Sequence, residues 1–165
     1  MIHAKLRTGE QAGTYIVPEP VTEAELLTMA QRLARRRLAK GRLLRGPSSV
    51  YEALQTCLLD RDHEVFGVLY LDTRHRILGV EELFRGTIDG THVHPREVLK
   101  QTLAHGAAAV ILVHNHPSGN LEPSAQDKAI THRLREALEL VEVRVLDHVI
   151  VSAEGYTSLA ELGEV

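Results

Sequence analysis

The chain has 165 residues, 44% of them hydrophobic, which is enough for one domain with an apolar core. A single cysteine excludes an internal disulfide framework and favours a reducing compartment, and no apolar run approaches the length that spans a bilayer. The net charge of −3 is unevenly distributed: residues 1–46 hold nine Lys/Arg and four Glu, whereas residues 47–165 hold ten Lys/Arg and eighteen Asp/Glu. We therefore expect a cytoplasmic protein without a membrane span, in which a basic N-terminal extension (residues 1–46) precedes a domain at residues 47–165.

The basic extension is predicted to contain one helix, over about residues 21–40. Thr22 and Glu25 have the spacing of a capping box, and leucines and alanines follow at helical intervals. Basic residues are concentrated near the end of this helix, including three consecutive arginines, Arg35, Arg36 and Arg37. Such a run is typical of a surface that binds DNA or another acidic partner, but also of a solvated helix face whose cations suit the C-terminus.

The second unit alternates helices and strands. Ser49 and Glu52 predict a second capping box and a helix from there to about residue 59. Apolar patterning and turn residues then predict, in chain order, strands at 64–71 and 76–84, a helix at 95–105, a strand at 107–113, a helix at 124–140, and strands at 144–151 and 156–158. The first two strands are expected to form an antiparallel hairpin, and the whole pattern predicts an α/β fold with a mixed β-sheet and flanking helices.

Two histidines directly follow the apolar strand at residues 107–113. On an extended chain, the spacing of His114 and His116 places both imidazoles on one face. Asp127 follows in the first turn of the helix that Ser124 is expected to begin. Two imidazoles and one carboxylate suit Zn²⁺, and three protein ligands leave a coordination position open for water, as in catalytic zinc sites. The sequence therefore predicts a Zn²⁺ site with three protein ligands: His114, His116 and Asp127.

Ser124 and Asp127 have two interpretations. Ser124 precedes Asp127 by one helical turn and is placed to donate a hydrogen bond to an oxyanion during hydrolysis. The same spacing is typical of an ordinary helix start, where serine is a preferred cap and an acidic residue suits the helix dipole. The full pattern H-x-H-P-S-G-x-x-x-P-S-x-x-D is more specific than any of its parts.

The spacing H-x-H-x₇-S-x₂-D resembles the JAMM motif of the JAB/MPN metalloproteases. Three further segments resemble the RadC branch of that family, so that the resemblance covers roughly residues 47–165: Glu82–Thr87, Val93–Val98 and Asp147–His148. It implies the JAB/MPN fold, which is similar in layout to the cytidine deaminases, a Zn²⁺ cofactor and hydrolysis of a peptide or isopeptide bond in an unidentified protein or peptide.

The resemblance also implies a general base, a glutamate that lies upstream at the start of a strand. Glu64 fits this place best because it precedes an apolar strand, and Glu81 and Glu82 are alternatives on the next strand. Asp147 and His148 are candidates for orienting a zinc ligand, or they form an ordinary pair on a strand.

A DNA-associated function, in repair or on a mobile element, is the alternative to hydrolysis. It would use Arg35, Arg36 and Arg37 to hold phosphates. Longer members of the RadC branch carry an N-terminal region that resembles helix-hairpin-helix DNA-binding modules. Residues 1–46 show no glycine-rich hairpin between two helices, so the chain resembles a short form that lacks this region.

Overall fold

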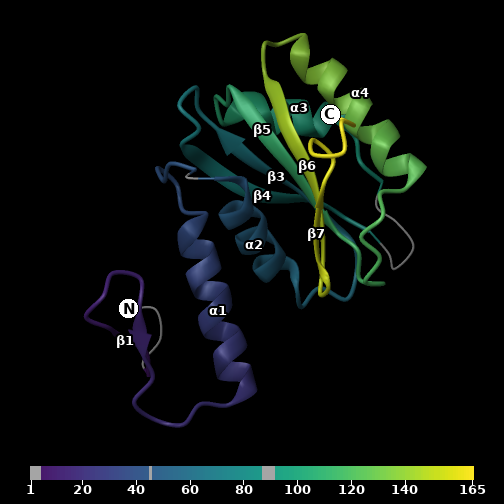
Figure 1. The fold of residues 1–165 in the computed structure, drawn as a ribbon. Helices are drawn as coiled ribbons and strands as arrows, with labels where there is room; N and C mark the ends of the chain where they lie inside the picture. The colour runs from purple at the N-terminus through teal and green to yellow at the C-terminus, as the bar shows by residue number, and fades with distance from the viewer. Residues whose placement is uncertain (1–4, 45, 87–91) are drawn as a thin grey trace.

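A five-stranded sheet forms the centre of the molecule (Figure 1). The computed structural model describes residues 5–44, 46–86 and 92–165. The strands are β3 (Val65–Leu71), β4 (Ile77–Arg85), β5 (Ala109–Asn115), β6 (Arg144–Ser152) and β7 (Gly155–Ser158), in the order β4-β3-β5-β6-β7. Only β5 and β6 pair in parallel, so the sheet is mixed, as the sequence predicted.

Two helices pack on each face of the sheet. The helices α1 (Glu23–Arg37) and α2 (Pro47–Leu58) share one apolar core with the sheet, and α3 (Pro95–Ala104) and α4 (Ala125–Glu139) share the other. Strands β3 and β5 are buried along their whole length because both of their faces are covered. No helix in the described ranges is long and apolar enough to cross a membrane.

The N-terminal segment contacts the rest of the chain through the end of α1. The expected capping box at Thr22 and Glu25 is present, and Ala34 and Leu38 enter the core that α2 shares with the sheet. The other half of α1 lies away from the sheet, beside a small hairpin of β1 (Arg7–Thr8) and β2 (Tyr15–Ile16) (Figure 1). The predicted boundary at residue 46 therefore follows a helix whose end already belongs to the core.

The second predicted capping box was wrong. Helix α2 begins two residues before Ser49, with Gly46 as the N-cap and Pro47 in the first turn, and no side chain caps it. Proline favours this place because its fixed φ suits a helix start and its missing N–H needs no partner there. Ser49 then falls inside the first turn, where its hydroxyl donates to the carbonyl oxygen of Gly46 at 3.1 Å.

Asp147, on β6, is a buried carboxylate that joins several elements. Its Oδ2 accepts hydrogen bonds from the hydroxyls of Tyr51 on α2 and Ser158 on β7. Its Oδ1 accepts from the backbone N–H of His148 at 2.7 Å and of Ala160 at 2.9 Å. Burial, followed by the bond to Asp147, raises the pKa of Tyr51 and keeps its hydroxyl a donor. All four neighbours donate in this arrangement, which suits a carboxylate because a carboxylate only accepts.

We expect Asp147→Asn to lower the free energy of unfolding by about 1.5–3 kcal/mol, because the amide loses the charge and offers one accepting oxygen in place of two, so that both hydroxyls lose their acceptor and must turn. Urea denaturation followed by circular dichroism measures the change. Asp60→Asn, at an exposed carboxylate, is the matched control and should unfold like the wild type. Equal stability of Asp147→Asn and the control would contradict this account.

Candidate metal centre

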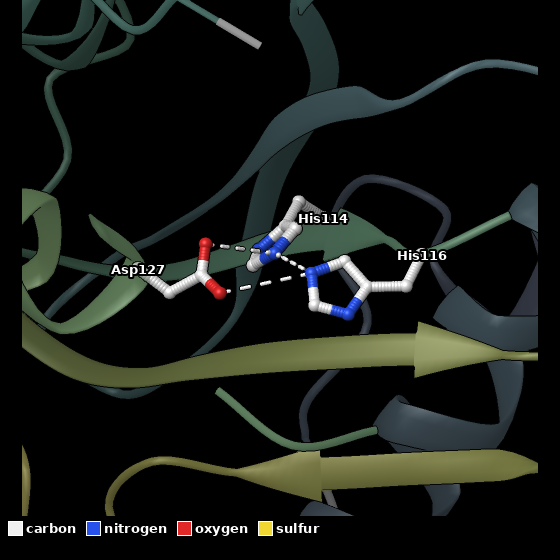
Figure 2. A group of neighbouring side chains, drawn as sticks. All are labelled: His114, His116 and Asp127. Atoms are coloured by element: carbon white, nitrogen blue, oxygen red, sulfur yellow. Dashed lines mark hydrogen bonds and ion pairs between the residues drawn. The ribbon is translucent and has the colours of Figure 1, made fainter. Parts of the chain in front are cut away.

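Three side chains converge at the end of β5 (Figure 2). His114 lies on the buried end of β5, His116 directly follows the strand, and Asp127 lies in the first turn of α4. Strand β5 and helix α4 thus each contribute to the cluster, and the segment between them turns the chain back. The structure brings together all three residues that the sequence predicted as zinc ligands.

The separations of the three donor groups suit one metal ion. Nε2 of His114 lies 2.8 Å from Nε2 of His116 and 3.2 Å from Oδ1 of Asp127. Nε2 of His116 lies 3.7 Å from Oδ2 of Asp127. Ligands of a tetrahedral Zn²⁺ ion, with bonds of about 2.0–2.1 Å, lie about 3.3 Å apart. The cluster is therefore close to the size that a zinc ion requires.

The hydrogen bond of His116 fixes which ring nitrogen is free. Its Nδ1 lies 2.6 Å from the carbonyl oxygen of Asn120. A carbonyl only accepts, so Nδ1 carries the proton and donates it. In the neutral imidazole, Nε2 then keeps its lone pair, which faces His114 and Asp127 as a metal ligand must.

A chain of hydrogen bonds fixes the proton of His114 in the same way. Thr131 on α4 donates its hydroxyl to the backbone carbonyl of Asp127 at 2.6 Å, so its oxygen must accept from Nδ1 of His148 at 2.5 Å. Nε2 of His148 is then the acceptor for Nδ1 of His114 at 2.8 Å. Burial lowers the pKa of His148 far below its ordinary value, which favours the neutral ring that this chain requires.

The donor set therefore fits Zn²⁺. The free lone pairs of His114 and His116 face each other at 2.8 Å and repel unless a cation lies between them. The hydroxyl and the backbone N–H of Ser124 both donate hydrogen bonds to Oδ2 of Asp127, and such donors favour the charged form of a carboxylate. The carboxylate is thus in the charged form that binds metals.

Ser124 is the N-cap of α4. Its hydroxyl donates to Oδ2 of Asp127 at 2.7 Å, its backbone N–H donates to the same oxygen at 2.7 Å, and its Oγ accepts from the backbone N–H of Asp127 at 3.1 Å. These bonds form a capping box and orient the Asp127 carboxylate. The sequence left two roles open for Ser124, a helix cap and a donor to an oxyanion. The structure shows the helix cap, and the oxyanion role stays a prediction.

Glu64 shares a cavity of about 490 Å³ with the three ligands, whereas the two alternative bases do not line it. Glu82 forms an ion pair with Arg61 at 2.7 Å, and Glu81 lies 3.2 Å from Nε2 of His105. Its place in this cavity favours Glu64 as the candidate base, and its role stays a prediction.

Asn115 is a buried residue of the site to which the sequence gave no role. Its Oδ1 accepts from the backbone N–H of Val65 at 2.7 Å, and its Nδ2 donates to the carbonyl of His63 at 3.0 Å. Asn115 thus holds the backbone on both sides of Glu64. Its position between His114 and His116 was the available signal, but the alternation of side chains along a strand turns it to the opposite face of β5, away from the two candidate ligands.

The other predicted residues lie apart from the cavity. Asp147 faces α2 and has no described bond to a ligand side chain; it reaches the site only through the backbone of His148. The arginines of α1 belong to the layer on the opposite side of the sheet from α4, and none lines the cavity. Arg35 lies beside Cys57, whose pKa burial raises, and Arg37 lies 3.7 Å from Glu52.

We expect His148→Ala to weaken zinc binding by about 10- to 100-fold, because His114 loses the acceptor that fixes its proton on Nδ1. Competition with a chromophoric chelator measures the affinity. The matched control is His132→Ala, an exposed histidine of α4 outside the cavity, which should bind zinc like the wild type. Unchanged affinity in His148→Ala would show that the hydrogen-bond chain does not support the ligand.

Comparisons with known proteins agree with the motif and the fold. The family model described as "RadC-like JAB domain" matches residues 44–164. The chain is 55% identical over 137 residues to a UPF0758 protein of Halorhodospira halophila, and 56% identical over 137 residues to one of Nitrosococcus oceani. Each alignment covers 83% of this chain but 61% of the relative, so the chain spans less than two thirds of their length. The chain belongs to the RadC-like JAB domain family.

Proposed function

We propose that the protein is a zinc-dependent hydrolase that cleaves a peptide or isopeptide bond in a protein or peptide substrate. The observation that carries this proposal is that one cavity brings together the His114, His116 and Asp127 cluster and the separate carboxylate of Glu64. A Zn²⁺ ion held by His114, His116 and Asp127 would polarise the scissile carbonyl and lower the pKa of a water molecule.

Glu64 would move the proton. Its carboxylate would accept a proton from the attacking water and deliver it to the nitrogen of the leaving amine. Asn115 keeps the backbone around Glu64 anchored to β5, and therefore keeps the carboxylate near the ligands. Both steps use one group, which serves first as a base and then as an acid.

Ser124 would stabilise the oxyanion. Its hydroxyl donates to Asp127 in the structure and must turn toward the substrate to act. The backbone N–H of Ser124 keeps its own bond to the same carboxylate oxygen, so Asp127 stays oriented while the hydroxyl moves. A donor of this kind contributes most when it is directed at the oxygen on which charge develops.

DNA binding by Arg35, Arg36 and Arg37 is a separate proposal. No described contact joins these arginines to the cavity, and the reaction above does not use them. A DNA complex that weakens with salt and is lost when all three are replaced would support it.

We expect Glu64→Gln to lower kcat by at least about 100-fold, because the amide cannot accept the proton, while zinc content stays unchanged. A cleavage screen of peptides and isopeptide-linked peptides, with metal analysis of the same preparations, measures both quantities. Glu82→Gln, which removes the carboxylate paired with Arg61 outside the cavity, is the matched control. A wild type without stoichiometric zinc, or a fully active Glu64→Gln variant, would refute the assignment.

Asn115→Ala is expected to lower kcat by about tenfold at unchanged zinc affinity, because the segment around Glu64 loses both of its anchors. Gln55→Ala is the matched control: Gln55 donates to the carbonyl of Ser152 at 2.8 Å but does not line the cavity. Thermal unfolding separates this effect from a loss of fold. If the two variants have the same kcat, Asn115 does not position the base.

A further inference from the structure

The cavity continues past the metal ligands along one side of α4. Gln126, Ala129, Ile130 and Arg133 line it at helical spacing, so a single face of the helix forms this wall. Arg133 lies six residues beyond Asp127, which corresponds to about 9 Å along the helix axis. This wall begins beside Asp127, continues over the apolar side chains of Ala129 and Ile130, and ends at the guanidinium of Arg133.

Arg133 is the one Arg or Lys among the described residues that line this cavity. Other cations of α4 have partners: Lys128 pairs with Glu164 at 2.6 Å, and Arg135 lies 3.3 Å from Nδ1 of His132. Arg133 is exposed and forms no hydrogen bond or ion pair with any described residue. A cation that has no partner within the described ranges, at the end of a substrate-sized groove, is suited to binding an anionic group of the ligand.

We propose that Arg133 forms a subsite for a single carboxylate of the substrate, located about two to four residues from the scissile bond. This inference rests on the proposed hydrolase function. An extended peptide advances about 3.3 Å per residue, so the helical rise of about 9 Å from Asp127 to Arg133 corresponds to about three residues. The carboxylate belongs either to the C-terminus of the substrate or to an Asp or Glu side chain, and the guanidinium binds it with paired N–H donors.

The charges of the cavity favour a peptide carboxylate over a nucleic acid. Glu64, Glu122 and Asp127 line the same cavity as Arg133. A phosphate backbone carries a charge at every nucleotide and would place several of them beside these carboxylates. A peptide with one carboxylate can place it against Arg133 and leave uncharged residues over Ala129 and Ile130.

Binding without turnover tests the subsite. The probes are three alanine-based hexapeptides, titrated into ¹⁵N-labelled, zinc-loaded Glu64→Gln protein at up to millimolar concentration and followed by NMR. One probe has a free C-terminus, one is amidated without any acid, and one is amidated with a single internal Glu. We expect at least one carboxylate probe to bind about tenfold more tightly than the uncharged amide, with shift changes on α4. The probe that binds identifies the source of the carboxylate.

The added substitution Arg133→Ala should abolish that preference, and Arg133→Lys should keep part of it because a lysine retains the charge but not the paired donors. Arg135→Ala, on the same helix but outside the cavity, is the matched control and should retain the full preference. Equal binding of all three probes, or a preference that survives Arg133→Ala, would overturn the proposal. The proposal would also be overturned if an oligonucleotide competed with the peptide for the wild-type cavity but not for that of Arg133→Ala.

Kinetics on any peptide that the wild type cleaves separate this subsite from the hydrolase proposal. Arg133→Ala should raise KM about tenfold for a carboxylate substrate and leave kcat nearly unchanged, whereas Glu64→Gln removes kcat. If no peptide is cleaved but the carboxylate preference depends on Arg133, the subsite stands and the hydrolase proposal fails. If cleavage occurs and KM does not respond to Arg133, the subsite proposal fails alone.

Discussion

The pairing of β5 with both of its neighbours is the constraint on which the site depends. The antiparallel register with β3 sets Phe66 opposite His114 and therefore brings the start of β3, with Glu64, to the cavity. The parallel register with β6 sets Leu112 opposite His148, which places His148 within reach of the ring of His114. A shift of either pairing by one residue would turn these side chains to the other face of the sheet.

Burial on both faces holds that register. Strands β3 and β5 are buried at every residue, so a slipped strand would expose apolar side chains or bury polar ones on either side. The two polar residues at the buried end of β5 both form hydrogen bonds. His114 bonds to His148, and Asn115 bonds to the backbone beside Glu64. Strand β5 therefore directs the candidate ligand His114 to one face of the sheet, and from the other face its Asn115 anchors the backbone beside the candidate base Glu64.

The sequence predicted the elements that have a local physical cause. The alternation of helices and strands, the capping box at Thr22 and the convergence of His114, His116 and Asp127 follow from spacing alone. The start of α2 was wrong because Pro47 at the first turn outweighed the Ser49 signal. The placement of Glu64 in the cavity, with Glu81 and Glu82 outside it, depends on the pairing of distant strands, and the bonds of Asn115 depend on a backbone segment fifty residues away. Sequence patterns do not encode such distances unless a family resemblance supplies them.

A chain of hydrogen bonds links two candidate metal ligands, from the ring of His114 through His148 and Thr131 to the backbone of Asp127. His114 comes from the sheet and Asp127 from α4, so this chain crosses the interface between the two elements. The fold therefore holds the cluster together against the repulsion between the two imidazole lone pairs, and a bound metal ion would relieve that repulsion. In small zinc domains the ion and the fold form together. Here the folded chain already positions the candidate ligands, so a metal ion that bound them could exchange while the protein around it stayed folded.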